Sequence, residues 1–343
     1  MENQSNPLVS VIITTYHNET YLPRAIESVL HQSYAPIELI VVDDNPPDSD
    51  ARAKTEAGMV RYPQAVYLRH PENRNGAAAR NTGIRTAKGQ YIAFLDNDDL
   101  YFSDHIESCV QALEANPGCN AVVCGVVKIC RGLCWDLIPA AEGDLARKLL
   151  FRETALGTGS NLFVQAEAVR TIGGFDERFR RHQDVEFGLR YFAKNKACAL
   201  KRVQIVKEMD GFSNVPNFQR FLETKQMLWH TFADTLAALT PDEQKRYYGS
   251  QYSSLLYTAC KAGDKKQIAY CLEQLTRYRP ANRKVRLLVI LSKLCLFRTY
   301  EALKKGIKRR NSNRIKKQVI CNLSEYDRSV LDRALSDGKG GTS

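Results

Sequence analysis

Short β-branched runs alternate with helical segments over the first 130 residues, and this alternation constrains the fold more than any other feature. The strand-like runs are residues 8–15, 37–42, 66–68, 91–95 and 121–127. Apolar residues at helical spacing lie between several of them. Strands that are joined through helices pair in parallel, and continuous apolar runs are typical of strands covered on both faces. The sequence therefore predicts an α/β fold with a doubly wound, mostly parallel sheet.

Polar groups follow three of these strands, at residues 14–16, 43–44 and 96–99. Parallel sheets bind ligands at the carboxyl ends of their strands, so these groups should meet in one crevice. The first strand is not followed by Gly-x-Gly-x-x-Gly, and the chain contains no Walker sequence. Dinucleotide-binding and P-loop functions therefore lose most of their support.

Asp96, Asp98 and Asp99 place three carboxylates within four residues. Confined like charges raise one another's pKa unless a cation relieves the repulsion. Mg²⁺ and Mn²⁺ prefer oxygen ligands and use one or two protein carboxylates together with substrate phosphates and water. A solvated acidic turn is the alternative. The position directly after a buried strand favours a metal site.

The net charge of +11 is unevenly distributed along the chain. Residues 1–210 hold 24 basic and 27 acidic residues, whereas residues 211–343 hold 25 and 11. This asymmetry indicates a boundary between two regions. No apolar run approaches the roughly 18 residues of a membrane span, and the non-basic N-terminus gives no reason to expect a signal peptide.

The second region has a helical pattern from Phe218 onward, with a helical-hairpin signature around residues 262–264. Residues 283–317 contain 13 Lys or Arg and a single acidic residue, interleaved with aliphatic side chains. An apolar face with a cationic border suits an anionic membrane surface. A helix packed on its own domain with a solvated basic face is the alternative. No nucleic-acid motif accompanies the charge, so a nucleic-acid partner is not expected.

Four segments resemble the inverting family 2 glycosyltransferases of the GT-A fold. They are residues 9–34, 37–44, 75–99 and 172–190, and the resemblance extends over about residues 8–210. It implies a GT-A-like α/β fold, with the helical region following at the C-terminus. The motifs are numerous, ordered and correctly spaced.

The resemblance assigns the nucleotide-sugar site to residues at the strand ends. Asp44 matches the residue that hydrogen-bonds the uracil of a UDP-sugar, and Thr14 and Tyr16 match contacts to the base and ribose. The Tyr16 ring can stack on the base, with an interfacial Tyr as the alternative. Arg80 matches a nucleotide contact of the family, and a guanidinium is well suited to bind phosphate. An ordinary surface Arg is the alternative. Asp96 is expected to face the ribose or the metal.

Asp96-Asn97-Asp98 matches the Asp-x-Asp pattern of this fold. By resemblance, metal coordination is assigned first to Asp98, with Asp96 and Asp99 as further candidates. A bound Mn²⁺ or Mg²⁺ would bridge the two donor phosphates and stabilise the leaving UDP as negative charge develops.

Asp184 matches the family's general base, which removes the proton of the acceptor hydroxyl so that the oxygen attacks the anomeric carbon with inversion. An N-cap Asp without a chemical role is the alternative. Gln183 stands where the family often has Glu, so no second carboxylate is expected there. His182 and Gln183, together with Gly159 and Ser160, are expected to line the acceptor and donor-sugar pocket. A structural role is the alternative for His182.

Residues 1–210 are thus expected to form a nucleotide-sugar-binding and catalytic domain, and residues 211–343 a basic α-helical region. The resemblance implies an inverting hexosyltransferase that moves one sugar from a nucleotide sugar, expected to be UDP-linked, to a hydroxyl of a growing surface glycan. Polysaccharide, lipooligosaccharide and capsule are the glycans considered, and their acceptors are often lipid-linked. The expected location is cytoplasmic, peripheral on the inner face of the plasma membrane.

Two other functions compete with this one. A nucleotidyltransferase can share a similar sheet and metal carboxylates, although it usually carries a Gly-rich, basic N-terminal signature that is absent here. A non-catalytic basic module that binds membrane or nucleic acid is the other.

Overall fold

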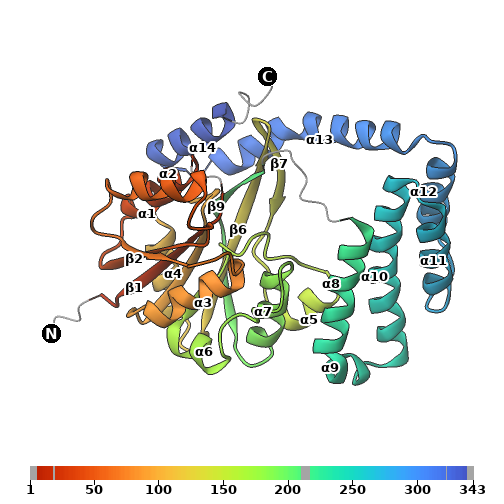
Figure 1. Ribbon diagram of the computed structural model, residues 1–343, viewed down its shortest axis with the longest axis horizontal. Coiled ribbons are helices and arrows are strands. Elements are labelled where there is room, and N and C mark those ends of the chain that lie inside the picture. Colours follow the sequence, from red (N-terminus) through yellow and green to blue (C-terminus); the bar gives the residue numbers. More distant parts are fainter. Residues whose placement is uncertain (1–5, 18–19, 210–216, 322, 338–343) are drawn as a thin grey trace. The chain divides into compact units, whose positions relative to one another are not determined.

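The computed structural model describes residues 6–17, 20–209, 217–321 and 323–337 (Figure 1). The chain divides into two compact units. The first is formed by residues 1–211 and 312–343, and the second by residues 212–311.

The first unit is built on one mixed sheet. Its strands are β1 Val9–Thr15, β2 Ile37–Asp43, β3 Val66–Arg69, β4 Tyr91–Asp96, β5 Asp99–Tyr101, β6 Ala121–Cys130, β7 Leu133–Ile138, β8 Phe163–Gln165 and β9 Ala197–Met209. They follow the order β3-β2-β1-β4-β8-β6-β9-β5, and β7 pairs with β6. The longest pairings, β1–β2, β1–β4 and β6–β9, are parallel. The predicted α/β class with a mostly parallel sheet is confirmed.

Helices cover both faces of this sheet (Figure 1). They are α1 Leu22–Leu30, α2 Asp50–Met59, α3 Gly76–Thr86, α4 His105–Glu114, α5 Leu145–Leu150, α6 Ala166–Thr171, α7 Gln183–Phe192 and α14 Glu325–Asp337. Strands β5, β7 and β9 were not predicted. Antiparallel pairs join β4 to β8, β6 to β7 and β8, and β5 to β9.

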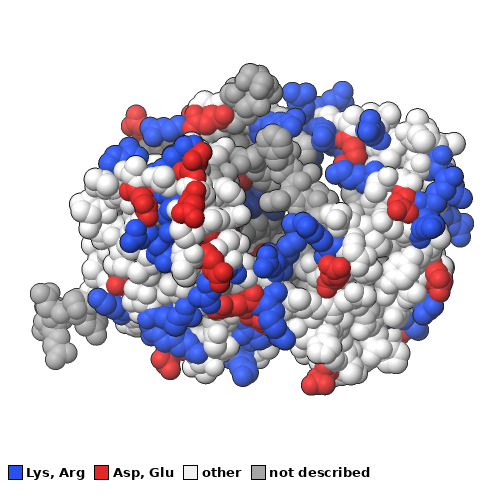
Figure 2. All heavy atoms as spheres, viewed as in Figure 1, with Lys and Arg blue, Asp and Glu red and all other residues white. Residues whose placement is uncertain are grey.

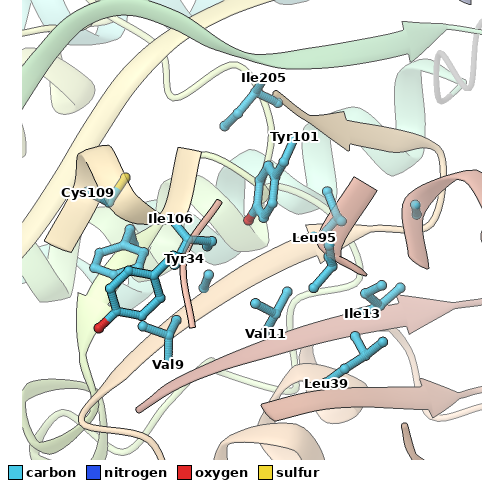
Figure 3. Packing of buried hydrophobic residues seen from close by; sticks show 14 of the residues in the cluster. Val9, Val11, Ile13, Tyr34, Leu39, Leu95, Tyr101, Ile106, Cys109 and Ile205 are labelled. Atoms are coloured by element: carbon cyan, nitrogen blue, oxygen red, sulfur yellow. The ribbon is translucent and has the colours of Figure 1, made fainter. Parts of the chain in front are cut away.

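The main core lies where alternate residues of β1 face α1 and α4. Val9, Val11 and Ile13 are fully buried there, and Tyr101 and Ile106 pack in the same cluster (Figure 3). Residues of opposite parity face the other side of the sheet because side chains alternate along a strand.

On the opposite face, α3 approaches β1 very closely at Gly83. A Cβ added to Gly83 would lie 2.4 Å from Cγ2 of Ile12. Only glycine allows this approach, which lets the later part of α3 lie directly against β1.

A separate cluster covers one face of β5, β6 and β9. Phe102 and Val127 pack there against Val319, Leu331 and Leu335. Ser103, just after β5, donates hydrogen bonds from its backbone N and its Oγ to the Asp327 carboxylate, at 2.7 and 3.0 Å. The sequence led us to treat residues 211–343 as one region, whereas residues 312–343 group with the first unit through this packing.

The second unit is helical, as the pattern from Phe218 predicts. It contains α8 Phe218–Thr231, α9 Ala233–Ala237, α10 Pro241–Ala262, α11 Lys265–Thr276 and α12 Arg283–Lys293, and α13 Phe297–Ile320 begins in it. Gly263 ends α10 with φ 74°, and the Asp264 carboxylate caps α11. The hairpin thus forms at the predicted place. Within the described ranges, no helix combines the length and apolarity required to cross a membrane.

Candidate active site

The ends of β1, β2 and β4 lie side by side at one edge of the sheet. Thr15 is in register with Asp43 of β2, and Thr14 with Asp96 of β4. Asn97 joins them further, because its Nδ2 donates to Thr15 Oγ1 and to the carbonyl oxygen of His17, both at 2.9 Å. The strand ends that the sequence placed in one crevice are therefore adjacent.

Asp96, Asp98 and Asp99 form a compact carboxylate cluster at this edge. One carboxylate oxygen from each lies within 4.8 Å of the others. Asp99 is fully buried, whereas Asp96 and Asp98 are partly exposed. This spacing and this oxygen chemistry fit a divalent cation. The exposed pair offers it a face open to substrate.

Asp99 is held by the loop before β8 and by β9. Its Oδ2 accepts hydrogen bonds from Thr158 Oγ1 and from Ser160 Oγ, the latter at 2.6 Å. Lys207 Nζ lies 3.5 Å from Oδ1 of the same carboxylate. Ser160 Oγ also accepts from the backbone N of Asp96 at 2.9 Å. Ser160, which we expected to line the pocket, thus binds both Asp96 and Asp99 and helps to position the cluster.

The three carboxylates repel one another, and a bound cation would relieve this repulsion. Burial and the neighbouring Asp99 raise the pKa of Asp98 to about 8, although Lys207 opposes the shift. Burial also raises the pKa of Asp99. Burial would raise the pKa of Asp96 too, but Arg80 and Lys207 outweigh it and hold that pKa below its usual value. Burial and mutual repulsion thus favour the protonated forms of Asp98 and Asp99 when no cation is bound.

Arg80 joins the carboxylate cluster to α7. Its Nη2 donates to Oδ1 of Asp96, and its Nη1 donates to Oε1 of Gln183 at 2.8 Å. A Cβ on Gly159 would lie 3.0 Å from Nη2, and one on Gly76 would lie 3.1 Å from Oε1 of Gln183. Both glycines therefore leave room for this bridge. Arg80 is buried in this link rather than lying on the surface.

Asp184 is the second residue of α7, directly after the bridged Gln183. His182 precedes the helix with φ 57°, a left-handed conformation that turns the chain into it. Asp184 is partly exposed, and among the residues that the structure describes none donates a hydrogen bond to its carboxylate. A partly exposed carboxylate without a hydrogen-bond donor among the described residues can accept a proton from a bound hydroxyl.

Lys128 completes the cationic side of the site. It lies on β6 in register with Lys207 of β9. Burial lowers the pKa of Lys128, and Lys207 adds to the shift, whereas Asp136, Asp184 and Asp99 oppose it. Lys128 therefore interacts electrostatically with both Asp99 of the cluster and Asp184.

Asp44 is buried with its carboxylate fully engaged. Oδ1 accepts from Nδ1 of His70 and from the backbone N of Arg74, and Oδ2 accepts from Asn73 Nδ2 and the backbone N of Asn75, all within 2.9 Å. A carboxylate offers about four acceptor positions. As described, Asp44 shapes the loop before α3, and its contact with a base stays a prediction.

Tyr16 lies just beyond β1 and is 46% exposed, with its ring centroid 4.1 Å from that of His17. Its open ring face leaves space for a planar ligand. Lys207, Lys128 and Thr158 were not among the predicted site residues. Lys207 lies on β9, whose alternation is broken by charged residues, whereas Lys128 directly follows the apolar run 121–127. Thr158 stood out only as part of the polar loop 157–161.

Comparison with known proteins gives a consistent result. Residues 10–173 match the sequence model of glycosyl transferase family 2. An uncharacterized glycosyltransferase of Rickettsia bellii is 29% identical over 259 residues, covering 74% of this chain and 37% of the relative. A relative from Rickettsia typhi is 27% identical and is covered over 79% of its length. The chain spans about two fifths of the first two relatives' length.

Two solved structures have a similar fold. Residues 1–349 of S. aureus TarS in complex with UDP are 13% identical with a TM-score of 0.50, over 83% of this chain and 91% of that fragment. The mannosyltransferase PcManGT of Pyrobaculum calidifontis, in complex with GDP-Man and Mn²⁺, is 17% identical with a TM-score of 0.52, over 98% of this chain and 88% of the other. At these identities the likeness concerns the fold, which is that of GT-A proteins.

Proposed function

We propose that the chain is a member of glycosyl transferase family 2, whose sequence model residues 10–173 match, and that it is a metal-dependent, inverting hexosyltransferase. Its donor is a nucleotide sugar, UDP-linked in our proposal. Its acceptor is a hydroxyl of a growing surface glycan such as a polysaccharide, lipooligosaccharide or capsule chain. Residues 1–210 carry the catalytic part, completed by the C-terminal segment that packs on them.

One observation carries the proposal. The Asp96–Asp98–Asp99 cluster is tied through Arg80 and Gln183 to the helix that presents Asp184. A donor phosphate at the cluster and an acceptor hydroxyl at Asp184 would therefore be held by one rigid hydrogen-bonded frame. Effective catalysis of a two-substrate reaction depends on such fixed relative placement.

Asp98 and Asp96 are the residues that would hold Mn²⁺ or Mg²⁺, with Asp99 behind them. A bound cation supplies charge stabilisation for the departing nucleoside diphosphate. The residues around it prepare its place: Lys207 and Arg80 limit the repulsion among the carboxylates, and Thr158 and Ser160 fix the orientation of Asp99.

Asp184 accepts the proton of the acceptor hydroxyl, and the oxygen then attacks the anomeric carbon from the face opposite the leaving nucleotide. Among the described residues none donates a hydrogen bond to the Asp184 carboxylate, which supports this role because its oxygens can accept from a bound hydroxyl. Tyr16 offers an exposed ring for the base, and Thr14 lies beside Asp96. We assign Gly159 and His182 to the pocket between the two reactants, since Gly159 adjoins Arg80 and His182 directly precedes α7.

UDP as the donor nucleotide is supported by analogy of fold. TarS structures hold UDP and UDP-GlcNAc, and the PcManGT structure holds GDP-Man. We place the enzyme in the cytoplasm, peripheral on the inner face of the plasma membrane, because glycan acceptors of this class are often lipid-linked and the second unit is strongly basic.

A donor panel tests the proposal. UDP- and GDP-sugars are incubated with Mn²⁺ or Mg²⁺, and nucleotide release is measured with and without glycan acceptors. We expect UDP release that requires a divalent cation and is lost in Asp98→Ala. Asp184→Asn should abolish transfer but retain donor binding, whereas the exposed Asp234→Asn on α9 serves as the matched control.

The same assay separates the competing functions. A nucleotidyltransferase would release pyrophosphate from UTP and a sugar phosphate, so pyrophosphate formation would refute glycosyl transfer. A basic binding module would show no turnover with any donor, and the two Asp variants would then leave its activity in cells intact.

A further inference from the structure

Exposed aliphatic side chains concentrate on one stretch of the second unit. Half of the large apolar side chains that are exposed among the described residues lie within residues 287–307. They are Leu287, Ile290, Leu294, Leu296, Leu303 and Ile307, which are 45–65% exposed. Single exposed apolar residues need no explanation, but six exposed aliphatic residues within this short stretch of chain do.

On α12 this set forms a face opposite the core. Val285, Leu288 and Ser292 are the buried residues of the helix. At about 100° per residue, Leu287, Ile290 and Leu294 point about 180° away from them. The helix therefore has two apolar stripes, and only one of them is used inside the unit. Leu303 and Ile307, four residues apart, make a further pair on α13.

Cations border this surface almost without acidic neighbours. Nine Lys or Arg side chains between residues 283 and 311 are exposed, and they include Lys284, Lys293, Lys305 and Arg309. Glu301 is the one acidic residue of that range, and it is engaged by Tyr257 and Lys304. In Figure 2 basic side chains gather at the right-hand edge, where Figure 1 shows α12.

We infer that this face, formed by α12 and the first turns of α13, binds the surface of an anionic lipid bilayer. A second copy of the chain is a poor occupant, because pairing the face with itself would bring cations against cations. Long basic side chains beside an aliphatic stripe can extend to lipid phosphates while the stripe enters the acyl boundary.

This inference deepens the membrane location contained in the proposed function and identifies the surface that makes the contact. It does not depend on catalysis. A lipid-linked acceptor would then be met by an enzyme already held at the bilayer, which raises the local concentration of one reactant at the other.

Co-sedimentation with vesicles tests the inference on the full chain. Vesicles of phosphatidylglycerol with phosphatidylcholine should bind the protein, and pure phosphatidylcholine should not. Leu287→Ser/Ile290→Ser should lower partitioning roughly tenfold or more. Lys293→Gln/Lys305→Gln should lower it about thirtyfold, since two cations near the surface are lost.

Matched controls come from the same unit. Lys265→Gln/Lys266→Gln removes two exposed cations of α11, and Met227→Ser removes an exposed apolar side chain of α8. Both controls should bind like the wild type. Point substitutions are used because deletion from residue 283 would also remove α14, which packs in the first unit.

Release of UDP from the donor in solution is measured on every variant, so that loss of vesicle binding and loss of catalysis are told apart. Equal partitioning of the wild type and both face variants would overturn the inference. So would a wild type that ignores anionic vesicles, or a dimer in light scattering that Leu287→Ser/Ile290→Ser converts to a monomer.

Discussion

Replacing Asp327 by Ala tests whether the C-terminal segment is an integral part of the first unit. The Asp327 side chain is buried and accepts hydrogen bonds from Ser103 N, Ser103 Oγ and Ser324 Oγ, at 2.7, 3.0 and 2.7 Å. The two bonds from Ser103 connect residues that are 224 positions apart in the chain.

The cost follows from the charge on the acceptor. A hydrogen bond to a charged group contributes about 1.5–3 kcal/mol. Loss of both bonds from Ser103, with a backbone N–H left unpaired, should lower the free energy of unfolding by about 3–4 kcal/mol. Ser103→Ala removes only the hydroxyl and should cost about 1–2 kcal/mol. Asp332→Ala is the control on the same helix. It removes an exposed ion pair with Lys316 and should cost under about 1 kcal/mol.

Tryptophan fluorescence can follow the first unit alone. The chain has two Trp residues, Trp135 on β7 and Trp229 on α8, one in each unit. In a Trp229→Phe background, urea unfolding monitored at Trp135 reports the first unit. If Asp327→Ala and Asp332→Ala shift the midpoint equally, residues 312–337 do not stabilise that unit and the reasoning fails.

Three further predictions concern the site. The pKa of Asp98 is raised to about 8 without metal, so Mn²⁺ binding at pH 7 should release about one proton. The affinity for Mn²⁺ should therefore rise about tenfold per pH unit up to pH 8. Calorimetry in buffers of different ionisation enthalpy measures the proton release, and an affinity that does not change with pH would contradict the prediction. Gly159→Ala should displace Arg80, because Nη2 of Arg80 lies 3.0 Å from the added Cβ, and kcat should fall at least tenfold. Gly58→Ala is the control: no atom lies within 4 Å of its added Cβ, so kcat should stay unchanged and Tm should rise slightly. Arg80→Lys keeps a charge near Asp96 but cannot reach Gln183 as well, so kcat should fall more than Mn²⁺ affinity; an equal fall in both would refute the bridging role.

The strand ends and their acidic residues could be predicted because they depend on local pattern. Apolar runs predicted β1, β2 and β4, and parallel pairing then places Thr15 beside Asp43 and Thr14 beside Asp96. The family resemblance added roles that spacing alone could not supply. Those roles remain proposals, and Asp44 illustrates why, since its four donors come from a loop whose course no pattern revealed.

Contacts between distant segments could not be predicted. Lys207 reaches Asp99 because β9 pairs with the three-residue strand β5, and the charged residues and the register shift in β9 hide its alternation. The packing of α14 in the first unit could not be predicted either. The helix follows a basic segment, and its sequence does not indicate which surface it covers. Charge asymmetry located a boundary near residue 211 but not the second one near residue 312.

The discontinuous first unit has a consequence for synthesis on the ribosome. All strands of its sheet have been synthesised by residue 209, but the helix that covers β5, β6 and β9 is made only after the 100 residues of the second unit. At about 5–20 residues per second this leaves Leu100, Phe102 and Val206 uncovered for roughly 5–20 s. During that interval the apolar face of β5, β6 and β9 lacks the helix that covers it in the folded chain, so the order of translation delays completion of this cluster until the last helix is made.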